Sequence, residues 1–360
     1  MSEAVTADEA RRGTVFGAGA YLVWGAFPLY FRLLLPAGAI EILVHRVVWS
    51  LLVCLVVVAI LRDVGWVRPL LAAPRRLARL GVAAAFIAVN WGVYIYGVNS
   101  GQVVESALGY FIGPLVTVLL GVLLLRERLR PLQWAAVGLG AVAVVVLTID
   151  YGRLPWIALV LAGSFATYGL MKKRIGADLG ALGSLTVETA MLLPFALGAL
   201  VWLEVTGRAT LAEQGPWHGV LLASTGVATA VPLLMFAASA RRVPLTTIGL
   251  LQFTTPVLQL LAGVLLLGES VPPSRWIGFS IVWLALIVLS VDSLRSLTSR
   301  RSLTSRRSPA SRRSPASRRS NTARSGTGNG TGVGVGAAQG HSGPGPTTEP
   351  PAAVTTTSKA

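Results

Sequence analysis

Ionisable side chains inside long apolar stretches are the first candidates for chemistry in this 360-residue chain. Glu188 lies in the apolar run 179–201 and has no cation near it in sequence. A carboxyl group withdrawn from water tends to hold its proton, so it can carry one through an apolar interior. The same group can instead be a protonated or hydrogen-bonded packing residue, and the sequence leaves both roles open.

A second group of ionisable residues opens another apolar run. Glu41 and His45 are four residues apart and share one helix face, with Trp49 one turn further along. Together with Arg46 they could bind a polar or zwitterionic solute, or His45 could titrate. Alternatively, Glu41 stabilises a helix N-terminus and pairs with Arg46 or Arg32. We favour this structural role for Glu41 and Arg46.

Uncharged polar residues form a third set. Asn90 and Tyr94 are four residues apart in the middle of an apolar run, beside Trp91, and Asn99 ends that run. These side chains can hydrogen-bond to or stack on a ring-bearing solute, but hydrogen bonds between helices use the same groups. Further candidates of lower weight are Tyr110, Tyr168 and Gln252.

Patterns typical of catalytic or metal centres are absent from the sequence. It contains no H-E-x-x-H, no G-x-S-x-G and no G-x-x-x-x-G-K-[ST]. The single cysteine, Cys54, rules out a disulfide framework and fits a small buried side chain. We therefore expect no catalytic residue, no metal, no cofactor and no enzymatic activity.

The elements that must position these residues are transmembrane helices. With 53% hydrophobic and 13% charged residues, the chain is too apolar for a soluble domain. Ten stretches are long enough to cross about 30 Å of hydrocarbon as helices. They are 14–35, 41–61, 79–99, 104–125, 132–149, 155–171, 179–201, 217–239, 243–267 and 273–291. The predicted fold class is an all-α polytopic membrane protein.

The distribution of Lys and Arg predicts the orientation of these spans. Cytoplasmic loops carry the excess of positive charge. Fifteen Lys and Arg residues before the C-terminal tail fall on one side, and only Arg153, Arg208 and Arg275 fall on the other. We expect a multi-pass protein of the plasma (inner) membrane with both termini cytoplasmic.

A passage of the sequence occurs twice. Residues 111–134 align without a gap with residues 253–276, at a constant offset of 142, and eleven of the twenty-four positions are identical. Each copy spans two predicted helices, and five spans separate the copies, so an odd number of crossings inverts the second half. Inverted repeats are typical of secondary transporters.

The predicted units follow from this duplication. The chain divides into a cytoplasmic N-terminus at 1–13, a first five-helix repeat at 14–149, a second and inverted five-helix repeat at 155–292, and a tail at 293–360. The tail is rich in Arg and Ser, then in Gly, Thr and Pro, so we expect disorder. It carries much of the net charge of +16, so this charge does not indicate a specific nucleic-acid partner. Attraction to anionic lipid is one role for the tail, and an unselected repeat expansion is another.

Several of the repeated residues have structural meaning. Pro114 and Pro256 occupy matching positions in mid-span, where each removes a backbone donor, and we predict helix breaks there. Simple curvature for packing is the alternative. Gly109 and Gly113 indicate close helix packing. Turn caps or loop hydrogen bonds are expected of Glu127 and Glu269.

A set of motifs resembles the RarD family of EamA-type transporters, in the drug/metabolite transporter superfamily. The motifs are "AYLVWGAFPLYFRLL", "EILVHRVVWS", "NWGVYIYGVN", "ESALGYFIGPLVTVLLGVLLLRERLRPLQW", "SFATYGLMKK", "VETAMLLP" and "GLLQFTTP". The resemblance covers roughly residues 13 to 292. It implies ten helices in two inverted halves around a central cavity, and export of small organic solutes. Members are often labelled chloramphenicol-sensitivity proteins.

Three positions depart from the family pattern. Gly113 stands where the family tends to have Asn, and Phe253 and Thr254 stand where it tends to have Tyr and Ile. If the Asn or Tyr touches substrate in relatives, that contact is missing here.

The sequence thus predicts a secondary transporter working by alternating access, with efflux as the direction the resemblance implies. Its partners would be a small organic metabolite or drug-like solute, the lipid bilayer and, as a coupling ion, protons. The alternatives are a membrane-embedded enzyme and a membrane interaction protein that transports nothing.

Overall fold

The computed structural model describes residues 2–126, 128–175 and 179–306, and within these ranges the chain is helical and has no strand. The helices of the first half are α1 (Ser2–Gly25), α2 (Phe27–Leu33), α3 (Ala39–Leu61), α4 (Val67–Leu71), α5 (Pro74–Asn99), α6 (Val103–Leu125) and α7 (Pro131–Tyr151). Those of the second half are α8 (Trp156–Ile175), α9 (Ala181–Val205), α10 (Gly215–Ala240), α11 (Leu245–Leu251), α12 (Thr254–Leu261), the π-helical turn η1 (Ala262–Leu266) and α13 (Pro273–Arg306).

Eight of these helical segments are long and apolar enough to cross a membrane. They are Ala39–Leu61, Pro74–Asn99, Val103–Leu124, Pro131–Tyr151, Ala181–Val205, Gly215–Ala240, Thr247–Leu266 and Pro273–Asp292. Asp8–Gly25 and Phe27–Leu33 meet at an angle of 46° and make a ninth if they form one bent span. The apolar part of α8, Trp156–Lys172, is shorter. The predicted all-α polytopic class is confirmed at the level of eight to nine spans.

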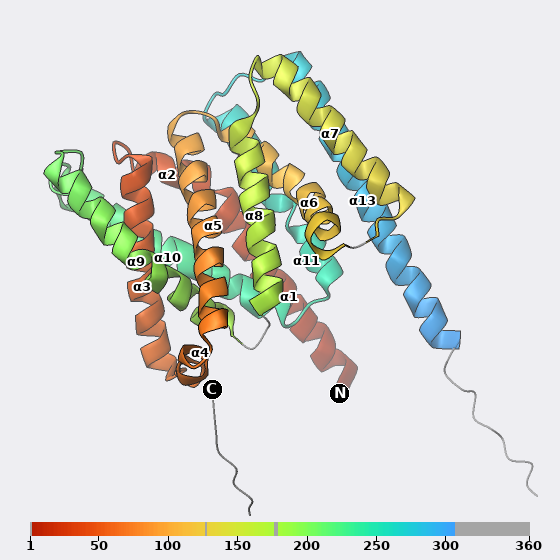
Figure 1. Ribbon diagram of the computed structural model, residues 1–360, viewed down its shortest axis with the longest axis horizontal. Coiled ribbons are helices and arrows are strands. Elements are labelled where there is room, and N and C mark those ends of the chain that lie inside the picture. Colours follow the sequence, from red (N-terminus) through yellow and green to blue (C-terminus); the bar gives the residue numbers. More distant parts are fainter. Residues whose placement is uncertain (1, 127, 176–178, 307–360) are drawn as a thin grey trace, which may run out of the picture. The chain divides into compact units, whose positions relative to one another are not determined.

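Corresponding helices of the two halves make corresponding contacts. α8 packs against α5 and α6, while α1 packs against α10 and α12. α3 contacts both α9 and α10, and α7 lies along α13. In Figure 1, α7 and α13 lie side by side and run in opposite directions.

Polar contacts fasten α7 to α13 near both ends. Asp150 in the last turn of α7 accepts hydrogen bonds from Ser274 and from Arg275 Nε, the latter at 2.8 Å, in the first turn of α13. Arg130, which precedes α7, lies 3.6 Å from Asp292 of α13. Asp150 and Asp292 are 142 residues apart, so they occupy matching positions of the repeat. Each reaches the start of the opposite helix, as an antiparallel pair requires.

The two proline positions differ in structure. α6 runs through Pro114 without interruption, so the predicted break is absent there. Residues 103–109 of α6 are buried, and packing on all sides holds the helix together despite one missing hydrogen bond. The matching segment is broken. α11 ends at Leu251 and α12 begins at Thr254, just before Pro256, which has no N–H to offer the carbonyl of Gln252.

α13 continues to Arg306, so the predicted start of the tail at residue 293 falls within this helix. The remainder of the predicted disordered tail, 307–360, lies outside the described residues, as does Glu127.

Gly109 allows α6 and α8 to approach closely. A Cβ atom at this position would lie 2.8 Å from the Ala158 carbonyl oxygen and 2.8 Å from Leu161 Cβ. Backbone of α8 cannot move aside without shifting the whole helix. Gly113, one turn later, has no atom within 4 Å of an added Cβ although the residue itself is buried. Only Gly109 therefore has the predicted close-packing role.

We expect Gly109→Ala to lower the free energy of unfolding by about 1–3 kcal/mol relative to Gly113→Ala, because the added methyl group overpacks the α6–α8 crossing. Both variants gain the same helix propensity, so Gly113→Ala is a matched control. SDS-titration unfolding of the purified proteins in detergent measures the difference. Equal stability of the two variants would contradict the close contact.

Candidate functional site

Arg46 lies at the centre of a buried group of aromatic rings. It is 4% exposed, on α3, and its guanidinium carbon lies 4.1 Å from the Trp91 ring centre, 5.3 Å from that of Phe27 and 5.8 Å from that of Phe31. Its Nε donates to Thr229 Oγ1 at 2.9 Å. The expected pairing with Glu41 is wrong, because no carboxylate of the described residues lies within ion-pair distance of Arg46. We call Arg46, Trp91, Phe27, Phe31, Thr229 and the neighbouring Tyr94 the Arg46 cluster.

Asn90 and Tyr110 lie beside the Arg46 cluster and are hydrogen-bonded to each other. Tyr110 donates to Asn90 Oδ1 at 3.1 Å, and Asn90 Nδ2 donates at 3.1 Å to both the Leu161 carbonyl and Ser164 Oγ. Asn90 therefore ties α5 to α6 and α8, as an interhelical hydrogen-bonding residue does.

Tyr94 differs from these neighbours. Its ring packs on Tyr110 at 5.6 Å and on Phe31 at 6.0 Å, yet its buried hydroxyl has no hydrogen-bond partner. The sequence brought forward Arg46, the pair of Asn90 and Tyr94, and Tyr110 as three separate candidates, and the structure places them together.

Glu188 forms a second buried group between α8 and α9. Its Oε1 lies 2.8 Å from Lys172 Nζ and 2.9 Å from Ser184 Oγ, and its Oε2 accepts from the Tyr168 hydroxyl at 3.1 Å. Lys172 also contacts Ser184. Glu188 is 1% exposed and the Lys172 side chain is 32% exposed, so only the acidic partner of this ion pair is buried. Lys172 is sixteen residues away in sequence, which is why no cation was apparent near Glu188. We call Glu188, Lys172, Tyr168 and Ser184 the Glu188 cluster.

Glu41 holds the loop that precedes α10. It is 1% exposed and accepts hydrogen bonds from Thr210 N at 2.7 Å, Thr210 Oγ1 at 2.9 Å and Leu211 N at 3.2 Å. Because the Thr210 hydroxyl donates to Glu41, it accepts at 2.8 Å from His218 Nε2. The structural role favoured for Glu41 is thus supported, with partners from the second half in place of Arg46 or Arg32.

His45 is held one turn from Glu41 by a tryptophan. Trp49 Nε1 donates to His45 Nδ1 at 3.2 Å. Since an indole can only donate, Nδ1 is the acceptor and the imidazole here is neutral, with its proton on Nε2. Nε2 is buried and has no partner.

Two further carboxylates, Glu105 and Glu269, accept hydrogen bonds from backbone groups of loops or helix starts. Neither is among the predicted site residues. Glu269 accepts from Val103 N at 2.6 Å and Val104 N at 2.9 Å, so it caps the N-terminus of α6. Glu105 accepts from Ile157 N at 3.0 Å and pairs with Arg153 at 2.7 Å. The loop-bonding role predicted for Glu269 is confirmed. For Glu105 the available signal was an acidic residue in the first turn of an apolar helix.

The remaining candidates lie apart from both clusters. Asn99 Nδ2 donates to the Ala37 carbonyl at 3.1 Å and fastens the loop before α3. Gln252 is exposed at the break between α11 and α12. Gln259, a buried residue of α12 that the sequence did not bring forward, donates to the Trp24 carbonyl at 3.2 Å.

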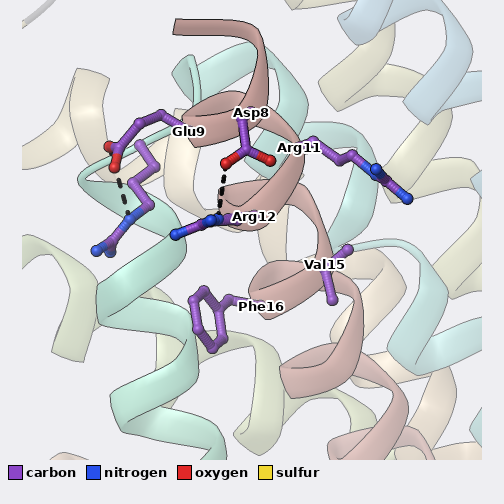
Figure 2. Close-up of a pocket in the computed structure, with 7 residues that line it drawn as sticks. Asp8, Glu9, Arg11, Arg12, Val15 and Phe16 are labelled. Carbon is purple, nitrogen blue, oxygen red and sulfur yellow. Dashed lines mark ion pairs between the residues drawn. The ribbon is translucent and has the colours of Figure 1, made fainter. Parts of the chain in front are cut away.

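A surface depression of about 450 Å³ lies beside the N-terminal end of α1. Figure 2 shows its charged lining, in which Arg12 pairs with Asp8 at 2.9 Å and Arg242 pairs with Glu9 at 3.8 Å. Within each pair the two opposite charges offset each other. None of the predicted site residues lines the depression.

Comparison with known proteins identifies the family. The sequence profile of the EamA-like transporter family matches residues 11–149 and, a second time, residues 154–291. The chain belongs to this family. It is 54% identical over 289 residues to Protein RarD of Streptomyces exfoliatus, covering 80% of this chain and 91% of that protein. It is 45% identical over 290 residues to an uncharacterized transporter of Pseudomonas aeruginosa, covering 80% of this chain and 96% of the relative.

A solved structure, described only as "Crystal structure of protein", superimposes with a TM-score of 0.51 at 17% identity, over 78% of this chain and 97% of that one. This likeness concerns the fold alone. The sequence relatives confirm the resemblance to RarD proteins, and their names indicate transporters. The chain is thus a multi-pass membrane protein of the EamA family of transporters.

Glu269 is a half-buried carboxylate of this EamA protein, and it lies between two spans. Burial raises the pKa of Glu269, while the bonds from Val103 and Val104 and the charges of Arg32 and Arg275 oppose the rise. The native state then keeps the proton at pH values where the unfolded chain has lost it. The stabilisation is therefore present at low pH and is lost as the pH rises through the elevated pKa.

We expect the melting temperature of the wild type, relative to Glu269→Gln, to fall as the pH rises from about 4, the usual range of a glutamate, towards neutrality. Differential scanning fluorimetry across this pH range measures it, with the exposed Glu213→Gln as control. A difference that grows with pH would show that the backbone N–H groups outweigh burial.

Proposed function

We propose that the chain is a secondary transporter that moves a small organic solute across the plasma membrane by alternating access, with export as the direction. The observation that carries the proposal is the double family match, at residues 11–149 and 154–291, combined with the antiparallel course of the matching helices α7 and α13. Two halves of opposite orientation can rock about a shared centre and expose it to each side in turn.

Packing between the halves supports the inverted repeat. The offset of 142 places α6 on the segment of α11 and α12, and the order of the helices pairs α1 with α8 and α5 with α10. If each helix is replaced by its counterpart, the contacts of α8 with α5 and α6 become contacts of α1 with α10 and α12. Both sets of contacts are present. A two-fold axis relating the halves accounts for this exchange.

Ten spans follow if the bent pair α1–α2 counts as one span and α8 as another. Packing among neighbours can accommodate a short helix, since the bilayer thins or flanking residues reach the interface. This count places both termini on the side of the arginine-rich loops, which the positive-inside rule assigns to the cytoplasm.

Thiol labelling tests this topology. In a Cys54→Ala background, we expect a cysteine at Glu213 (Glu213→Cys) to react with a membrane-impermeant maleimide on intact cells. A cysteine at Val64 (Val64→Cys) should react only after permeabilisation. Both positions are exposed in loops, so reactivity reports the side of the membrane. The reverse pattern would overturn the proposed orientation.

The Glu188 cluster supports proton coupling. A neutral Glu188 would lose its charge attraction to Lys172, whose side chain is 32% exposed and could then turn to water. Protonation therefore weakens the link between α8 and α9, the first two helices of the second half. A proton arriving from one side could in this way bias the position of the two halves.

We expect flux in sealed vesicles, measured by mass detection for a panel of amino acids, nucleosides and amphenicols, to follow an imposed pH gradient. Glu188→Gln should abolish the response to the gradient, because the amide cannot take up a proton. Glu204→Gln, an exposed carboxyl on the same helix, is the control. Unchanged flux and pH dependence in Glu188→Gln would exclude this residue from coupling, and no flux for the whole panel would count against a transporter.

A further inference from the structure

The guanidinium of Arg46 is buried without an anion. It is 4% exposed, and in the described part of the chain no carboxylate lies within ion-pair distance. Nε bonds to Thr229, while the two terminal nitrogens make no hydrogen bond and, unlike the Tyr94 hydroxyl, are not fully enclosed. Burying an unpaired charge is costly, and the faces of Trp91, Phe27 and Phe31 offset only part of this cost. The site therefore has one uncompensated positive charge.

A second unsatisfied donor adjoins this charge. The Tyr94 hydroxyl is buried without a partner, and the Tyr94 ring lies three residues from Trp91 on the same face of α5. Arg46 and Tyr94 both pack on Phe31, at 5.8 and 6.0 Å. An arginine held only for packing would not require an unpaired hydroxyl beside it.

Several polar groups around the site are already satisfied. Asn90 and Tyr110 bond to each other, and the Tyr30 hydroxyl bonds to Ser224 Oγ at 2.7 Å. The Ser50 hydroxyl, one turn from Arg46 on α3, is buried without a partner. Arg46 and Tyr94 both retain free donors beside Phe31.

We infer that Arg46 and Tyr94 together bind the carboxylate of a monoanionic solute whose apolar or aromatic body lies among Phe27, Phe31 and Trp91. The inference rests on the proposed function and specifies its substrate class. The planar guanidinium presents two parallel N–H groups to a carboxylate, and the hydroxyl donates a third bond. One negative charge neutralises the site, whereas a phosphate dianion would leave a buried excess of negative charge.

The test is equilibrium binding to the full-length protein in nanodiscs, by isothermal titration calorimetry without any gradient. The probes are phenylacetate, its neutral analogue phenylacetamide and the cationic phenethylamine. We expect the wild type to bind phenylacetate at least about tenfold more tightly than either analogue, in line with the strength of a charge-assisted bond.

Variants assign the preference to the two residues. Arg46→Gln should remove the preference for phenylacetate, and Arg46→Lys should restore part of it. Tyr94→Phe deletes only the unpaired hydroxyl, so the fold is kept; it should weaken phenylacetate by about 3–10-fold and leave phenylacetamide unchanged. Ser100→Ala, a change on an exposed loop away from the cluster, should leave all three affinities unchanged.

No charge-dependent binding by the wild type, or an unchanged preference in Tyr94→Phe and Arg46→Gln, would overturn the inference. The transporter proposal would survive that result if vesicles still move neutral solutes. Conversely, selective binding of phenylacetate without flux of any solute would support this site and count against transport.

Discussion

The lack of water in the bilayer core is the constraint on which the rest of this structure depends. Polar groups at membrane depth must find partners within the protein, because lipid tails offer none. At the ends of the spans, Glu41, Glu105 and Glu269 accept backbone N–H groups from loops or helix starts of other segments. Each carboxylate thereby links two parts of the chain that are far apart in sequence.

The same constraint separates the two buried clusters. The Glu188 cluster contains an acid and a base that pair with each other. The Arg46 cluster contains a base with aromatic neighbours and no acid. A balanced pair suits a switch, while an unbalanced charge suits a ligand of opposite sign. On our proposals, coupling and recognition would therefore lie on different helices.

Sequence alone could predict the spans, the duplication and most of the polar residues that matter, because apolar length and repeated spacing are local properties. It could not predict partners. Lys172 lies sixteen residues from Glu188, and Thr210 lies 169 residues from Glu41, so their pairing depends on how helices pack. The uninterrupted α6 at Pro114 has the same origin, since surrounding helices outweigh a local preference to break.

The contacts between α7 and α13 limit how the bundle can rearrange. Asp150 pairs with Arg275 at the start of α13, and Asp292 of α13 pairs with Arg130, which precedes α7. Both ends of α7 are therefore linked to α13. A shift of one helix along the other by a turn, or a separation of the two helices at either end of α7, would break the Asp150 contact, the Asp292 contact or both. Any motion that preserves these two contacts moves α7 and α13 together as one rigid unit. Conformational change must then occur among the other helices, including the interrupted segment of α11 and α12.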